Sequence, residues 1–288
     1  MTLAVVWNCS GGLHFASDSR ISKGDKSSDF GVKVVPVHIK VFEPQKEGES
    51  PPVAFDSTYG MCFSGDFSGA SIVRNFLAIT LQRLQYVPTY SSVSFLNICR
   101  IVERIYSELS SKIQDEIEND SIDFFLAGYC PKNKKIMLAK FYIDYGEAIE
   151  KFEPAFEIID YESSSDPIFY IGSGEEEFRF YLGIHEFRPL SKRPLYALRS
   201  IINTGKVASV GGNIQVGAFD RNNEFYMLGI VEEKKDENGL INGISYYYAG
   251  IDMNSDSIEV DNGAFMVMGN YMESIFLVPK RQGIPFTP

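Results

Sequence analysis

The sequence contains few of the residues that bind metals or cross-link secreted proteins. Its 288 residues include only four cysteines and three histidines. The cysteines (Cys9, Cys62, Cys99 and Cys130) are widely spaced and form no CxxC pair. This spacing argues against a zinc site, and it predicts that the thiols stay reduced. We therefore expect neither a metal nor an organic cofactor.

Excess basic charge and long apolar runs are also missing. The formal charge is −11 and the pI is about 4.9, which argues against a nucleic-acid-binding protein because such a protein needs a basic face. No apolar stretch reaches the length needed to cross a bilayer, and the run Leu3–Trp7 is too short for a signal peptide. We expect a cytoplasmic protein with neither a membrane nor a nucleic-acid partner.

What the chain does have is material for a large core. Apolar residues make up 44% and aromatic residues 14% of the sequence. This composition fits one large globular domain, or a domain with an appendage. The charged segment Glu232–Asn238, which we predict to be a loop, marks the boundary between the two parts. We expect a core over residues 1–231 and a C-terminal extension over residues 232–288 that packs on or beside it.

The hydrophobic pattern alternates between strand and helix periods. Helical spacing covers Ser68–Leu84 and Val93–Ile117, and a further helix is expected over Pro194–Thr204. Strands are predicted at Leu3–Trp7, Leu13–Ser17, Val34–Phe42, Thr58–Ser64, Asp123–Tyr129, Ile136–Ile143, Ala155–Ile159, Ile168–Ile171, Gly212–Phe219, Glu224–Ile230, Tyr246–Tyr248 and Ala264–Met268. This order predicts an α+β fold of two antiparallel sheets packed face to face, each covered by helices.

Thr2 is the residue with the most complete chemistry. If Met1 is removed, the chain begins with a threonine that carries a nucleophilic hydroxyl and a free amine on one residue. An α-amine titrates near ~8, so it can accept the hydroxyl proton at neutral pH. If Met1 is retained, no such base exists.

The amine and hydroxyl also need a nearby cation, a carboxylate that holds this cation, and a donor for the oxyanion. Asp18 ends the second strand of the first hairpin, which folds back beside Thr2. For the cation we prefer Lys40, inside an apolar run, over Lys33, which adjoins a polar loop. Gly65 joins a strand to a helix, where free N–H groups are expected.

These residues carry a resemblance to a known family. The chain resembles the proteasome β-type subunits and their bacterial ring-forming peptidase relatives, which are N-terminal nucleophile hydrolases. Besides Thr2, the matching segments follow in order over residues 2–230: Phe15–Arg20, Ile39–Phe42, Cys62–Gly65, Phe124–Tyr129, Ile171–Gly174 and Gly211–Gly212.

The resemblance implies a four-layer αββα sandwich, homo-oligomeric rings and threonine peptidase chemistry. Thr2 would be nucleophile and base, Asp18 and Lys40 would tune it, and the Gly65 N–H would hold the oxyanion. Ser173 would help to position the amine. The implied substrate is a peptide or an unfolded protein, and an ATPase partner is left open.

One segment departs from the family's pattern. Val207 and Val210 occupy positions where the family usually has polar residues that support the threonine, and Ser209 substitutes only with a shift of one residue. This departure keeps two alternatives open. The first is a ring or scaffold subunit without catalysis, and the second is an acylase that acts on a small amide.

Overall fold

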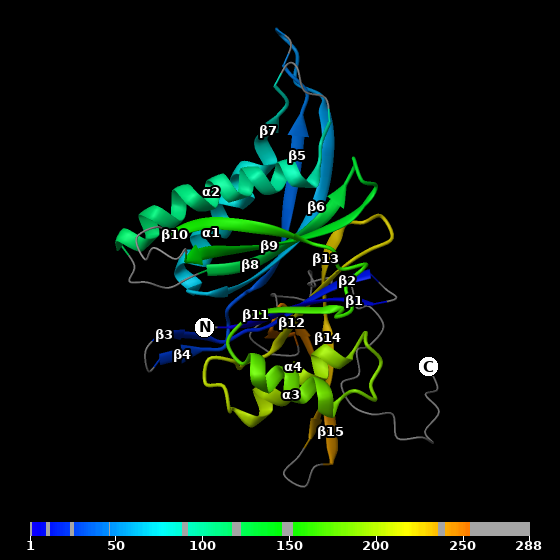
Figure 1. The fold of residues 1–288 in the computed structure, drawn as a ribbon. Helices are drawn as coiled ribbons and strands as arrows, with labels where there is room; N and C mark the ends of the chain where they lie inside the picture. Colours follow the sequence, from blue (N-terminus) through cyan, green and yellow to red (C-terminus); the bar gives the residue numbers. More distant parts are fainter. Residues whose placement is uncertain are drawn as a thin grey trace, which may run out of the picture.

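The computed structural model of the chain describes residues 2–9, 12–23, 26–45, 47–87, 92–116, 122–145, 152–235 and 240–253. Two large sheets and four α-helices make up most of these residues (Figure 1). The predicted α+β class is confirmed. The strand expected over Ala264–Met268 lies outside the described residues. Among the described residues, none of the helices combines the length and apolar character that spanning a bilayer requires.

The first sheet has five antiparallel strands in the order β11-β1-β2-β12-β13. The strands are β1 (Leu3–Cys9), β2 (Gly12–Asp18), β11 (Ile168–Gly172), β12 (Ile214–Phe219) and β13 (Phe225–Leu228). The predicted hairpin is therefore present, with Ala4 opposite Ser17. This register places Asp18, the last residue of β2, beside the beginning of β1.

The second sheet has six strands in the order β10-β9-β8-β6-β5-β7. Its strands are β5 (Val34–Phe42), β6 (Val53–Gly65), β7 (Leu84–Gln85), β8 (Ile122–Cys130), β9 (Lys135–Tyr145) and β10 (Phe152–Ile159). Only β7 runs parallel to its neighbour, pairing with β5 at Val41 and Phe42. Pro36 in β5 is exposed and lies beyond this short pairing, as expected for a residue with no N–H to donate.

The helices form two pairs, each beside one sheet (Figure 1). They are α1 (Phe67–Thr80), followed by the 3₁₀ helix η1 (Leu81–Arg83), α2 (Phe95–Glu116), α3 (Glu175–Ile184) and α4 (Arg193–Thr204). Asp66 caps α1 by accepting from the Gly69 N–H, and Gly205 ends α4 in the left-handed region. The helices expected over Ser68–Leu84, Val93–Ile117 and Pro194–Thr204 match α1, α2 and α4 to within a few residues.

Three buried clusters hold the elements together. One lies between α1, α2 and the six-stranded sheet, and a second between α3, α4 and the five-stranded sheet. The third joins the two sheets and includes Val6 and Phe15 from one, with Cys62, Phe125 and Leu138 from the other. Burial of this apolar area in three places is the main stabilising contribution to the fold.

Two short sheets differ from the predicted loops. The polar composition of Ser22–Asp29 predicts a loop, but this range overlaps the small hairpin of β3 (Ile21–Lys23) and β4 (Lys26–Ser28). The charged segment Glu232–Asn238 is not all loop, because β14 (Ile230–Lys235) pairs with β15 (Ile241–Tyr248). A third short strand, β16 (Ile251–Asp252), completes that sheet. Pairing with β15 satisfies the backbone of a segment whose charge suggested a loop.

Candidate active site

Thr2 is buried at the point where β1 begins. Its side chain and backbone are only 4% exposed, and its carbonyl oxygen accepts a hydrogen bond of 2.9 Å from the Ser173 N–H. This bond continues the β1–β11 ladder, in which Leu3 lies opposite Gly172. The structure therefore brings the backbone of Ser173 to the Thr2 carbonyl oxygen, and the expected role of Ser173 toward the amine stays a prediction.

Asp18 is fully buried and accepts four hydrogen bonds. Its Oδ1 accepts from the Leu3 N–H at 3.1 Å. Its Oδ2 accepts from the N–H groups of Arg20 and Gly211, at 3.0 and 3.1 Å, and from Lys33 Nζ at 3.0 Å. A carboxylate with this many donors is held in one orientation. Because Leu3 follows Thr2 directly, this arrangement fixes Asp18 beside the first peptide group after Thr2.

Lys33, and not Lys40, is the cation beside Asp18. The side chains of Lys33 and Asp18 are 1% and 0% exposed. Lys40 instead forms a partly exposed ion pair of 3.2 Å with Asp56 on β6. Seven residues of extended chain separate the two lysines, a distance of about 23 Å. The expectation that Lys40 accompanies Asp18 is therefore corrected.

Strict alternation along β5 explains this correction. Pro36, His38 and Lys40 fall on one face of the strand and are exposed or half-buried, while Val37 and Ile39 on the other face are buried. The apolar neighbours of Lys40 therefore point away from it. Applying the period of two to this run would have placed Lys40 on the face of β5 opposite Val37 and Ile39, which pack against α1 and α2.

Burial shifts the pKa values of both partners. It raises the pKa of the Asp18 carboxyl, against the opposing effects of Lys33 and of the N–H groups of Gly211 and Leu3. It lowers the pKa of the Lys33 ammonium, against the opposing effect of Asp18. Both shifts have one cause, the loss of water around a charge, and contact between the two opposite charges offsets part of it.

Gly172 is where three strands meet. Its φ is +99°, and a Cβ atom there would lie 1.8 Å from the Thr2 carbonyl oxygen and 2.9 Å from Cβ of Ser64. Only glycine permits this approach. The contact brings the end of β6, where Gly65 has a φ of +103°, to the beginning of β1. Gly65 thus neighbours the site, and its role toward an oxyanion stays a prediction.

The segment with the unexpected valines contributes through its backbone. Val210 is buried against α3 and α4, and Val207 packs beside Gly174. Gly211, which follows Val210, donates its N–H to the Asp18 carboxylate. A Cβ atom at Gly211 would lie 2.2 Å from the Arg20 guanidinium carbon. Sequence reasoning looked for polar side chains here and missed the backbone donor.

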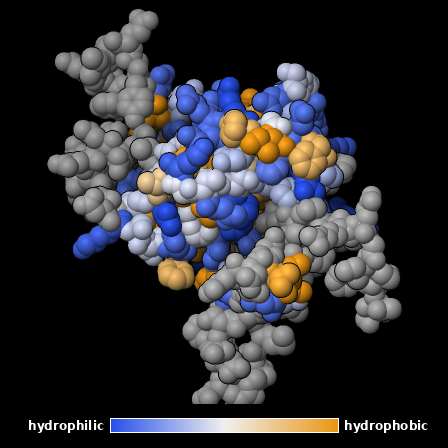
Figure 2. Space-filling model, turned by 90° about the horizontal axis from the view of Figure 1, so that it is seen from below, coloured by the Kyte–Doolittle hydropathy of each residue, from blue (hydrophilic) through white to orange (hydrophobic). Residues whose placement is uncertain are grey.

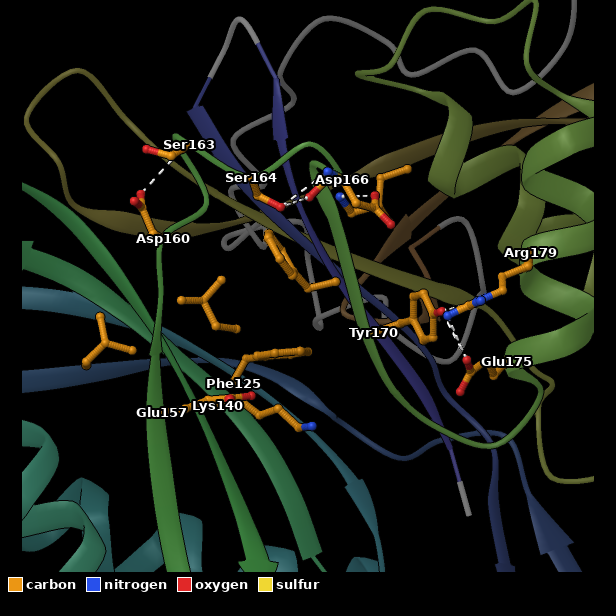
Figure 3. Close-up of a pocket in the computed structure, with 14 residues that line it drawn as sticks. Phe125, Lys140, Glu157, Asp160, Ser163, Ser164, Asp166, Tyr170, Glu175 and Arg179 are labelled. Atoms are coloured by element: carbon orange, nitrogen blue, oxygen red, sulfur yellow. Dashed lines mark hydrogen bonds and ion pairs between the residues drawn. The ribbon is translucent and has the colours of Figure 1, made fainter.

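A cavity of about 660 Å³ opens beside this region, at the edges of the two sheets. It lies between β10 and β11, and its lining includes Phe125, Lys140, Glu157, Tyr170, Glu175 and Arg179 (Figure 3). Tyr170 contacts both Arg179 and Glu175. Thr2, Asp18 and Lys33 do not line the cavity. The candidate site therefore rests on the contacts around Asp18 and not on this hollow.

Comparison with known proteins places the fold. No family model matches the chain, and no curated protein does. An Anbu mutant from Hyphomicrobium sp. strain MC1 is similar, with a TM-score of 0.54, 17% identity, and coverage of 79% of this chain and 87% of that chain. The Anbu complex from Pseudomonas aeruginosa, solved as a helical assembly, gives a TM-score of 0.50, 20% identity, and coverage of 78% and 86%.

The comparisons correct the family expected from the sequence. The similar structures are Anbu proteins, from a proteasome-related family, and not the proteasome β-type subunits that the motifs suggested. At 17% and 20% identity the likeness concerns the fold alone. The chain thus has a fold of the kind found in Anbu proteins.

Proposed function

We propose that this chain, after removal of Met1, is an N-terminal threonine amidohydrolase that cleaves peptide bonds. The observation that carries the proposal is the buried Asp18–Lys33 pair, which is bonded to the peptide N–H directly after Thr2. Buried charges are costly, and titratable groups perturbed by burial and a charge partner cluster at functional sites. The Anbu fold adds support at the level of architecture.

In the proposed reaction, the Thr2 hydroxyl oxygen attacks the amide carbonyl carbon and its proton passes to the Thr2 α-amine. The Lys33 ammonium favours the neutral form of that amine and stabilises the developing alkoxide. The Gly65 N–H holds the oxyanion. The carbon–nitrogen bond then breaks, the leaving amine takes the proton from the α-amine, and water hydrolyses the ester on Thr2.

The larger architecture belongs to the same proposal. We take the three buried clusters as the interfaces of a four-layer αββα sandwich. The division into a core over residues 1–231 and an extension over residues 232–288 is kept, with the ion pair between Arg199 and Glu232 joining them. A cytoplasmic location remains a prediction.

Self-association is also proposed, with a second copy of the chain as the partner. Figure 2, which looks at the molecule from below Figure 1, shows separate apolar groups in a mainly hydrophilic surface. Large apolar side chains are exposed near α3, with Phe180 at 58%, Ile184 at 47% and Phe187 at 69%. Burying them between copies would be favourable. Sedimentation of the full chain as an oligomer would support this, and a monomer at all concentrations would refute it.

The test of catalysis is chemical. Intact mass shows whether Met1 is removed, and a threonine-directed electrophile then reports the reactivity of Thr2. We expect the wild-type chain to gain one label, Thr2→Ser to be labelled at a lower or similar rate, and Thr2→Ala to gain none. Equal labelling of wild type and Thr2→Ala would refute the proposal.

One observation favours the scaffold alternative. Val207 and Val210 pack in the cluster beneath α3 and α4, and this segment contacts Asp18 through the backbone N–H of Gly211. A trimmed chain that takes up no label would favour the scaffold. If labelling occurs, a panel of peptides and small amides separates a peptidase from an acylase.

A further inference from the structure

Gln215 is a buried polar residue at a position where the pattern of its strand calls for an apolar one. Its neighbours Ile214 and Val216 on β12 pack into the cluster beneath α3 and α4. Since side chains alternate along a strand, Gln215 points to the other face, toward the six-stranded sheet. It is 1% exposed. A polar side chain in this place requires partners.

Those partners all belong to the segment that carries Lys33. The Gln215 side-chain oxygen accepts hydrogen bonds from the N–H groups of Lys33 and Val34, at 2.8 and 3.1 Å. Its amide nitrogen donates to the carbonyl oxygen of Gly31. Three hydrogen bonds from one side chain therefore fix the backbone on both sides of Lys33 and leave the Lys33 side chain directed at Asp18.

The Gln215 side chain is itself held in place by a turn from later in the sequence. A Cβ atom at Gly250 would lie 3.2 Å from the Gln215 amide nitrogen, so the turn at Gly250 packs directly against it. Asn213, also on the β12 side, donates to the Gly250 carbonyl oxygen at 2.9 Å. Gly250 lies between β15 and β16, in the segment expected to be an extension. A segment that is far from Thr2 in the sequence thus supports the segment that places Lys33.

We infer that Gln215 is a positioning residue that sets Lys33 against Asp18, an inference that rests on the proposed threonine chemistry. The hydrogen bonds of the Gln215 side chain go to Gly31, Lys33 and Val34. Gln215 holds the Lys33 backbone in place, and this keeps the Lys33 ammonium in contact with the Asp18 carboxylate. Displacing a reacting group by about 1 Å can cost about 100-fold in rate.

The test compares two substitutions of similar size with one control. Gln215→Met removes the acceptor and the donor, whereas Gln215→Glu keeps oxygen acceptors for the Lys33 and Val34 N–H groups. Ser110→Ala is the control, because it deletes another buried hydrogen bond, from Ser110 to the Tyr106 carbonyl oxygen in α2. All variants are compared under conditions where unfolding curves show them fully folded.

We expect Gln215→Met to lower the rate of Thr2 labelling by up to about 100-fold. Gln215→Glu should recover part of this loss. It should also shift to higher pH the point at which the rate of Thr2 labelling falls as Lys33 loses its proton, because a carboxylate near Lys33 raises the Lys33 pKa. Ser110→Ala should keep the wild-type rate and profile. If both Gln215 variants label like Ser110→Ala, with unchanged pH profiles, the inference is wrong while the proposed function stands.

A second measurement does not depend on catalysis. The Nζ signal of Lys33, identified by its loss in Lys33→Met, can be followed by NMR as a function of pH. We expect the Lys33 titration to move in Gln215→Met and to stay unchanged in Ser110→Ala. An unlabelled wild-type chain would refute the threonine chemistry, and an unmoved Lys33 titration in Gln215→Met would refute the positioning role by itself.

Discussion

Lys33 Nζ lies 3.0 Å from Asp18 Oδ2, and both side chains are shut off from solvent. Three backbone N–H groups, those of Leu3, Arg20 and Gly211, complete the surroundings of the carboxylate. The pair therefore joins the first hairpin, the segment before β5 and the segment before β12. A single ionic contact organises three parts of the chain around Thr2, and the following predictions depend on it.

Replacing each lysine separately distinguishes the two candidates for the cation. Lys33→Met leaves the Asp18 carboxylate buried without its counter-ion, and we expect a loss of about 3–5 kcal/mol in the free energy of unfolding. Lys40→Met removes a pair whose side chains are 36% and 58% exposed, and should change stability by about 0–1 kcal/mol. Urea unfolding curves measure both. Equal losses would contradict the assignment of Lys33.

The pH dependence of Thr2 labelling should report the lowered pKa of Lys33. Labelling rises as the Thr2 amine loses its proton and falls when Lys33 loses its own. Because burial lowers the Lys33 pKa, the falling limb should lie below the ordinary value of 10.5. Lys33→Arg stays charged in this range and should remove that limb. A falling limb that is the same in wild type and in a folded Lys33→Arg chain would argue against this cause.

Gly172→Ala should damage the site directly. The added Cβ atom would collide with the Thr2 carbonyl oxygen, and the φ of +99° is unfavourable for alanine. We expect a loss of at least about 1–3 kcal/mol in stability and of most Thr2 labelling. Gly183→Ala in α3 is the matched control, since no atom apart from its chain neighbours and the adjacent backbone of its own helix lies within 4 Å of the added Cβ. It should stabilise the chain by about 0.5–1 kcal/mol with labelling unchanged. Similar behaviour of the two variants would contradict the prediction.

The ion pair of Arg199 on α4 with Glu232 on β14 should tie the extension to the core. Both side chains are mostly buried, at 17% and 18% exposure, and burial lowers the pKa of Arg199 to about 10. Arg199→Met and Glu232→Gln should each cost about 1–3 kcal/mol. The double variant should cost less than the sum, because it leaves no unpaired charge. Thermal or urea unfolding of the wild type, the two single variants and the double variant gives the free energies for this double-mutant cycle. Additive losses would show that the two residues do not interact.

Local pattern was enough for most of the secondary structure. The alternation over Val34–Phe42 matches β5, and the apolar stripes match α1 and α2, because periodicity reflects which face each residue presents to the core. The hairpin that places Asp18 beside the beginning of β1 was accessible as well, because turn-forming residues separate two short apolar runs. In the charged segment after Val231, composition indicated a loop and was wrong up to Lys235, because these residues belong to β14 and pair with the next strand, β15.

The sequence by itself determined the α+β class, the hairpin that brings Asp18 to Thr2, and the turn residues around Gly65 and Ser173. Only the tertiary structure decided that Lys33 is the partner of Asp18 and that Gln215, 182 residues further along, binds the Lys33 backbone. Propensity and periodicity act over a few residues. Which buried charges and amides meet is set by how the two sheets stack, and no local pattern contains that information.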